Sequence, residues 1–138
     1  MQMKMMLKLF FICVVAALLS PVYAAEAVRV YIVSPVDGAE VSSPFIVRFG
    51  LQGMGVAPAG IEFPGTGHHH LLIDVEQLPP AGKPIPADEK HLHFGKGQTE
   101  TELTLPPGKH SLQLLLGDYL HMPQDPPLVS EKITVIVK

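Results

Sequence analysis

The sequence predicts an all-β fold, on three observations. Short segments in which apolar and polar residues alternate recur along the chain, and this period of two is typical of half-buried strands. Clusters drawn from the 12 glycines and 14 prolines separate these segments, and such clusters mark turns. No stretch combines helical periodicity with capping residues. Short strands between frequent turn signals favour a sandwich or a small barrel.

Two strands are predicted before the first long loop. Residues 28–33 form a β-branched run that ends at Ser34-Pro35-Val36-Asp37-Gly38, where proline and Asp-Gly supply turn geometry. Residues 45–51 follow as a strand whose one face carries Phe45, Val47, Phe49 and Leu51. The glycine-rich stretch 52–67 is predicted to be a loop.

Four strands are predicted after that loop. The first covers residues 68–75, and the proline-rich segment 77–87 that follows is expected to cross between sheets, because proline donates no backbone N–H to a central ladder. Residues 99–105 and 110–116 are expected to pair as a hairpin around Pro106-Pro107-Gly108. After a loop at 117–127, residues 133–137 form the closing strand.

The strand spacing favours a single antiparallel immunoglobulin-like sandwich over residues 25–138. A small Greek-key barrel of the cupredoxin kind is the alternative. The 114 residues of this range suit one domain with one modest core.

Residues 1–24 have the pattern of a cleaved signal peptide. Lys4 and Lys8 precede an apolar run at 9–19, and Val22-Tyr23-Ala24 offers a small-x-small cleavage site. A membrane anchor needs about 20 apolar residues, and Pro21 interrupts this run earlier. Cys13 lies in the middle of the run rather than at its end, which argues against a lipoprotein. The sequence therefore predicts a periplasmic or secreted protein without a stable membrane anchor.

The composition after cleavage excludes several classes of function. Loss of Lys4, Lys8 and Cys13 leaves eight basic and 13 acidic residues, a charge of −5 with histidine neutral, and no cysteine. This chain has no basic patch for nucleic acid, no disulfide and no thiol nucleophile. The Gly-x-Ser-x-Gly, P-loop and His-Glu-x-x-His motifs are also absent. A binding module is therefore favoured over an enzyme.

Histidine clusters carry the only strong chemical signal. Six of the seven histidines fall at 68–70, 91–93 and 121. Strand alternation sends His68 and His70 to one face and His69 to the other. Neutral imidazoles spaced two apart on a strand can bind one Zn²⁺ or Cu²⁺ ion. The candidate metal ligands are His68, His70, His91, His93 and His121.

A structural role for these histidines is the alternative. Rings at strand ends often bond to backbone carbonyls or carboxylates. His110, in the strand after Pro106-Pro107-Gly108, is expected to be structural. Asp118 is a candidate for the acceptor that orients an imidazole. Only Met54 and Met122 remain after cleavage, too few for a Met-rich Cu⁺ carrier. The histidines could also contact a small polar ligand, and the sequence identifies no protein partner.

Four segments resemble a known family. They read Gly-His-His-His-Leu-Leu-Ile-Asp at 67–74, His-Leu-His-Phe-Gly-Lys-Gly-Gln-Thr-Glu at 91–100, Leu-Pro-Pro-Gly-Lys-His-Ser-Leu-Gln-Leu at 105–114 and Gly-Asp-Tyr-Leu-His-Met-Pro-Gln-Asp-Pro-Pro at 117–127. In this order they are similar to the exported bacterial domain of unknown function numbered 4399. The resemblance implies a small periplasmic sandwich and no particular activity. Its His-x-Pro-His loop has Gln124 here in place of the second histidine.

The sequence therefore predicts a periplasmic binding or accessory module whose histidine-lined end binds a metal ion or a small polar ligand. A structural or protein-interaction domain is the alternative. A metal-dependent enzyme would require an open coordination position in a cleft.

Overall fold

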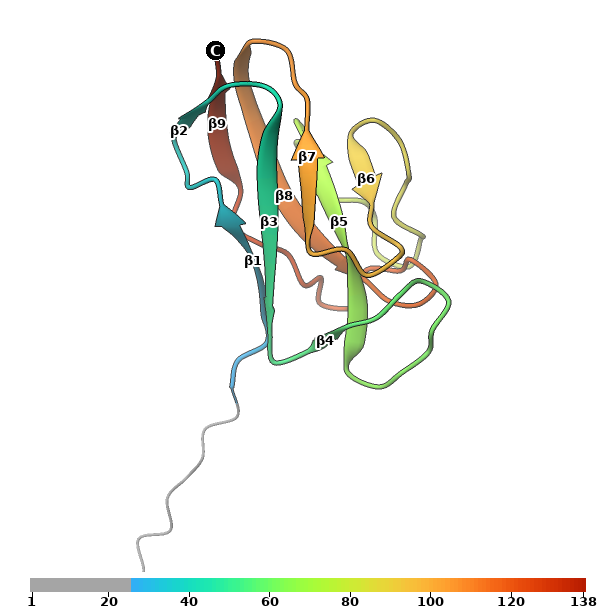
Figure 1. Cartoon of the computed structure of the whole chain (residues 1–138). Coiled ribbons are helices and arrows are strands. Elements are labelled where there is room, and N and C mark those ends of the chain that lie inside the picture. Colours follow the sequence, from blue (N-terminus) through green and yellow to red (C-terminus); the bar gives the residue numbers. More distant parts are fainter. Residues whose placement is uncertain (1–25) are drawn as a thin grey trace, which may run out of the picture.

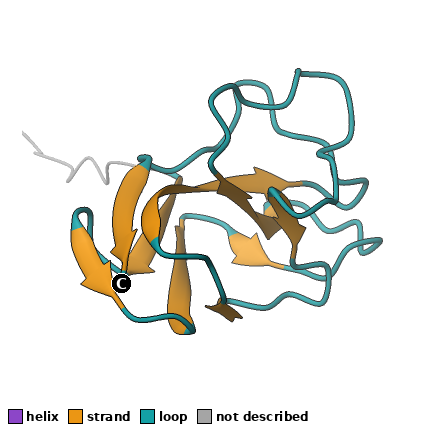
Figure 2. Cartoon of the chain, turned by 90° about the horizontal axis from the view of Figure 1, so that it is seen from above, coloured by secondary structure: helices purple, strands orange, loops and turns teal. Residues whose placement is uncertain are grey.

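The structure is a computed structural model that describes residues 26–138 (Figure 1). The predicted signal peptide and its cleavage site lie outside the described residues. Within 26–138 every regular element is a strand, and Figure 2 shows loops joining strands without helices. The all-β prediction is confirmed.

The smaller sheet has three antiparallel strands in the order β1-β3-β7. They are β1 (Arg29–Ser34), β3 (Phe45–Gln52) and β7 (Glu100–Leu103). Alternation in β3 buries Val47 and Phe49 and leaves Ile46 and Arg48 exposed. The predicted period of two therefore matches this strand.

The larger sheet has six strands in the order β2-β9-β8-β5-β4, with β6 also paired to β5. The strands are β2 (Ala39–Val41), β4 (Gly55–Val56), β5 (Thr66–Ile73), β6 (His91–His93), β8 (Gly108–Gly117) and β9 (Ile133–Val137). The β2–β9 and β4–β5 pairs are parallel, and the others are antiparallel. Strand β5 lies between β8 and both β4 and β6, so every residue from Gly67 to Ile73 is buried.

One apolar core joins the two sheets. Phe49 of the smaller sheet packs in the same cluster as Leu71 and Leu114 of the larger sheet. A second cluster of Leu72, Ile85 and Leu115 covers the opposite face of the larger sheet. Because Leu71 and Leu72 are neighbours on β5, this strand is buried on both faces.

The predicted hairpin between residues 99–105 and 110–116 is wrong. Strand β7 pairs with β3, whereas β8 pairs with β5 and β9. The segment between β7 and β8 therefore passes from one sheet to the other. Pro106 and Pro107 donate no N–H to a hairpin ladder. Leu103 and Leu112 are buried in the same core although they lie in opposite sheets, so their burial does not require a hairpin.

The proline-rich segment 77–87 also differs from its prediction. It leaves β5 and returns at β6, and both strands belong to the larger sheet. Ile85, which is 5% exposed, packs with Leu72 and Leu115. This contact holds the segment over the outer face of the larger sheet instead of letting it cross.

Candidate metal centre

Strand β5 directs two histidines to the outer face of the larger sheet. His68 and His70 alternate with Leu71, which points into the core between the sheets. His68 lies opposite Gly117 and His70 opposite Leu115 in the antiparallel β5–β8 ladder. Both imidazoles are buried, at 0% and 1% exposure.

The neighbouring strand contributes His93. In the β5–β6 ladder His93 lies directly opposite His70, so the two side chains share a face. Their ring centroids are 5.1 Å apart. His93 is the most exposed of the clustered histidines, which places it at the solvent side of the cluster.

A tight loop positions His121. The Asp118 carboxylate accepts hydrogen bonds from the backbone N–H groups of Leu120 and Met122, at 2.8 and 2.9 Å. His121 has a φ of 63°, in the left-handed region that non-glycine residues adopt rarely. Its carbonyl accepts a 2.8 Å hydrogen bond from the Ile85 N–H. The loop and the proline-rich segment therefore hold one another over the sheet.

Ring nitrogens of His68, His70, His93 and His121 converge within 4.8 Å of one another. The His68 Nε2 atom lies 3.1 Å from His93 Nε2 and 3.2 Å from His121 Nδ1. A neutral imidazole has only one N–H, so His68 Nε2 can donate at most one hydrogen bond. A cation between the rings would instead accept a lone pair from each ring nitrogen that faces it.

Other ring nitrogens of the cluster are buried without any hydrogen-bond partner in the described chain. These atoms are His68 Nδ1 and both nitrogens of His70. Leaving such a group unsatisfied costs about 1–3 kcal/mol. Tetrahedral Zn²⁺ with Zn–N bonds of about 2.0–2.1 Å would place nitrogens about 3.3 Å apart, close to the two separations at His68. Two separations in the cluster therefore match a tetrahedral site, whereas nitrogens as far apart as 4.8 Å would have to move closer by about 1.5 Å to share one ion.

The electrostatic setting keeps the rings of His68, His70 and His93 neutral. Burial and the neighbouring imidazoles of His93 and His121 lower the pKa of His68 to about 4. Burial and the same neighbours, with His68, lower the pKa of His70 to about 3. Burial and His121 also lower the pKa of His93. Neutral imidazole is the form that binds metals, so no proton has to leave these rings at pH 7.

Two glycines leave room for the rings. A Cβ at Gly117 would lie 2.8 Å from His70 Cε1, and a Cβ at Gly95 would lie 2.3 Å from His93 Cε1. Neither glycine was predicted from the sequence to be part of the site. The available signal was a glycine at the end of the apolar strand 110–116, since glycine in a strand often marks a close approach.

A cavity of about 190 Å³ adjoins the cluster. Three of the converging histidines line it together with apolar side chains of the proline-rich segment. The lining residues are His70, Pro84, Ile85, Ala87, His93 and His121. An ion held by the cluster would therefore face a space open to a further ligand.

His69 lies on the other face of β5, as alternation predicts. It is 0% exposed and its ring packs against Phe49, with centroids 5.2 Å apart. Neither ring nitrogen has a hydrogen-bond partner, and burial lowers the pKa of His69 to about 4. His69 is thus a neutral core residue separated from the cluster by the sheet itself.

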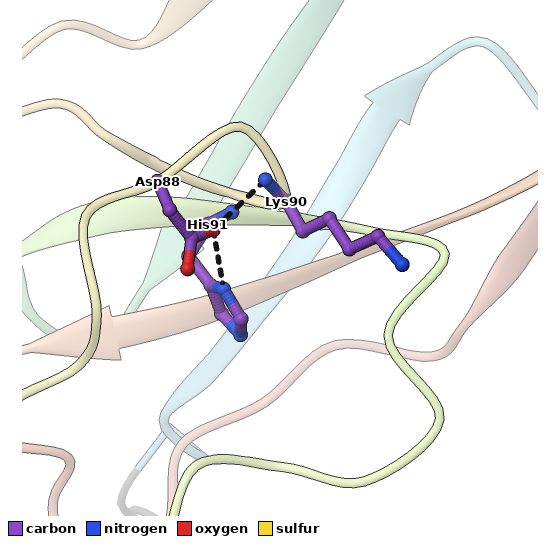
Figure 3. Close-up of polar contacts among 3 residues, drawn as sticks. All are labelled: Asp88, Lys90 and His91. Carbon is purple, nitrogen blue, oxygen red and sulfur yellow. Dashed lines mark hydrogen bonds and ion pairs between the residues drawn. The ribbon is translucent and has the colours of Figure 1, made fainter.

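The structure does not bring His91 into the converging group. Its Nδ1 atom lies 2.8 Å from Asp88 Oδ1, and the same carboxylate oxygen accepts from the backbone N–H groups of Lys90 and His91 (Figure 3). The His91 hydrogen bond lowers the pKa of Asp88. His91 lies opposite Leu72, two residues beyond the His70–His93 pair, and its ring bonds to Asp88 in the segment before β6.

Most of the chain matches one protein family. The family described as "Domain of unknown function (DUF4399)" matches residues 47–138, and the chain belongs to it. This range contains all four converging histidines. No curated protein and no solved structure matches the chain. Among the described residues, no helix is long and apolar enough to span a membrane.

Proposed function

We propose that this protein is an exported module that binds one divalent transition-metal ion through His68, His70, His93 and His121. The observation that carries the proposal is the convergence of four ring nitrogens within 4.8 Å, with both buried ring nitrogens of His70 left without partners. We further propose that the two-sheet architecture is an immunoglobulin-like sandwich, which serves as the rigid support for this site.

The donor set favours Zn²⁺ or Cu²⁺. Four imidazoles provide neutral nitrogen donors, which suit these ions, whereas Mg²⁺ and Ca²⁺ prefer oxygen. The converging group contains no carboxylate. For the same four ligands, Cu²⁺ is expected to bind more tightly than Zn²⁺.

The proposed location and role have separate support. The basic, apolar and small-residue order of residues 1–24 is typical of a secretory signal, and it supports a periplasmic or secreted location. The lack of nucleophile motifs supports binding or an accessory role over catalysis. Metal binding outside the cytoplasm is the function that combines both.

A hydrogen-bonded histidine scaffold is the second candidate. The contacts from His68 Nε2 to His93 and His121, at 3.1 and 3.2 Å, have hydrogen-bond lengths. In that case the cluster would hold the 117–127 loop to β5 and β6 without an ion. A protein of this kind would be indifferent to metals and would lose stability when the rings are removed.

Calorimetric titration with Zn²⁺ and Cu²⁺, combined with elemental analysis, tests the proposal on the mature protein without a histidine tag. We expect one equivalent to bind, and at 100 times Kd the ion should stabilise the fold by about 2.7 kcal/mol. The variant His68→Ala/His93→Ala should lose this binding. His91→Ala is the matched control, since it removes an imidazole from the same strand as His93 but outside the cluster, and it should bind normally. Absence of stoichiometric binding by the folded wild-type protein would refute the metal site.

A further inference from the structure

The cavity beside the cluster points to a second ligand. Resting on the proposed metal site, we propose that the bound ion takes a small aliphatic carboxylate from solution, with its oxygen on the metal and its alkyl chain against Pro84, Ile85 and Ala87. The charge of the donor set, the position of the cavity and the chemistry of its walls each support this proposal.

The charge of the site favours an anion. A divalent ion held by four neutral imidazoles keeps its full charge of two, and no carboxylate belongs to the converging group. Asp118 acts on His68 only through its field, and its Oδ1 atom is bonded to two backbone N–H groups of its own loop. The four neutral donors leave the charge of the ion uncompensated, so an anionic ligand would be bound favourably.

The position of the cavity gives that anion access to the ion. His70, His93 and His121 form part of its lining, so the ion would lie at its wall. His93 is exposed and His121 is half-buried, which leaves this side open to solvent. Zn²⁺ with four protein ligands forms a closed tetrahedral site, whereas tetragonal Cu²⁺ offers axial positions to a further ligand.

The walls select the rest of the ligand. Pro84, Ile85 and Ala87 bring only hydrocarbon to the cavity, so an inorganic oxyanion would find no hydrogen-bond donor on these side chains. The volume of about 190 Å³ exceeds the roughly 30 Å³ share of one water molecule. A carboxylate with a short alkyl chain matches a metal at one end and apolar walls at the other.

Titration of the Cu²⁺-loaded mature protein with formate, acetate, propionate and butyrate tests this proposal. The visible and electron paramagnetic resonance spectra of Cu²⁺ should shift as carboxylate is added, and the shift should reach a plateau. Each added methylene should tighten binding about three- to fourfold. Ala87→Glu should supply its own carboxylate, shift the starting spectrum and weaken the response to butyrate at least tenfold. Ala81→Glu is the matched control, since it adds the same charge in the same exposed segment outside the cavity lining, and it should respond like the wild type.

The outcomes separate the two proposals. If one equivalent of Cu²⁺ binds but no carboxylate changes the spectrum, the carboxylate site is wrong and the metal site stands. The same conclusion follows if Ala87→Glu behaves like Ala81→Glu, or if formate binds as tightly as butyrate. If Cu²⁺ itself does not bind stoichiometrically, the metal proposal fails and the carboxylate site fails with it.

Discussion

The two ends of the β5–β8 strand pair hold histidines in opposite settings. At one end His68 and His70 lie opposite Gly117 and Leu115, and their ring nitrogens face other imidazoles or no partner. At the other end His110 has an acceptor for each nitrogen. Its Nδ1 lies 2.7 Å from Asp74 Oδ2 and its Nε2 lies 2.9 Å from the Pro106 carbonyl oxygen.

This difference shows how surroundings assign a role to one residue type. A carboxylate and a carbonyl oxygen only accept, so both contacts of His110 are satisfied when both of its nitrogens carry hydrogen. The Asp74 hydrogen bond accordingly raises the pKa of His110. Burial lowers the pKa of His70 to about 3, so that ring keeps a free lone pair. The His110 ring links Asp74 to the Pro106 carbonyl, whereas the neutral rings of the cluster are suited to bind a cation.

Acidification should give the largest effect, in the metal-free protein. The lowered pKa values of His69 and His70, about 4 and about 3, mean that the unfolded state binds more protons below its pKa of about 6.5. Their stabilising contribution is therefore complete above pH 6.5 and is lost as the pH falls toward 4. Between pH 7 and pH 5 each should cost roughly 2 kcal/mol. Urea unfolding at the two pH values measures the change.

The control for acidification is the variant His69→Leu/His70→Leu, which removes both buried bases. Its unfolding free energy should vary less between pH 7 and pH 5 than that of the wild type. An equal pH dependence in the two proteins would show that these rings are not the groups responsible.

Replacement of Gly117 should weaken metal binding at the cluster end of the β5–β8 pair. The Cβ of Gly117→Ala would lie 2.8 Å from His70 Cε1 and 3.2 Å from its Nδ1, so the ring must move. Metal affinity should fall about 10–100-fold, the range typical of changes that misorient a ligand. Titration calorimetry measures this change. Gly55→Ala, whose Cβ would meet only Thr66 Cγ2 at 3.3 Å, should bind as the wild type does, and unchanged affinity in Gly117→Ala would argue against His70 as a ligand.

His110→Gln should give the smallest effect and the opposite pH dependence. Loss of its contacts to Asp74 and Pro106 should cost on the order of 1 kcal/mol. Because the folded-state pKa of His110 is raised, its charge-dependent contribution is present below about pH 6.5 and is lost as the pH rises through the folded value. The stability difference between variant and wild type should therefore shrink from pH 6 to pH 9, and metal binding should not change. A difference that grows with pH would contradict a raised pKa of His110.

Strand alternation explains which parts of the candidate site were predictable. It placed His68 and His70 on one face and His69 on the other, and the structure agrees. It could not separate His91 from His93, which also share a face. Their difference comes from the β5–β6 register, in which His93 lies opposite His70 and His91 opposite Leu72. Register depends on pairing between distant segments, which a local pattern does not contain.

Local sequence patterns were enough to predict the all-β class, the faces of the β5 histidines, and the strands around 28–33, 45–51, 68–75 and 133–137. These follow from local turn chemistry and a period of two. Tertiary packing places β7 and β8 in different sheets. It also holds the proline-rich segment over the larger sheet through Ile85 and brings His121 to His68. These features depend on burial of apolar surface shared by segments far apart in the chain, which selects among arrangements that satisfy the same local patterns equally well.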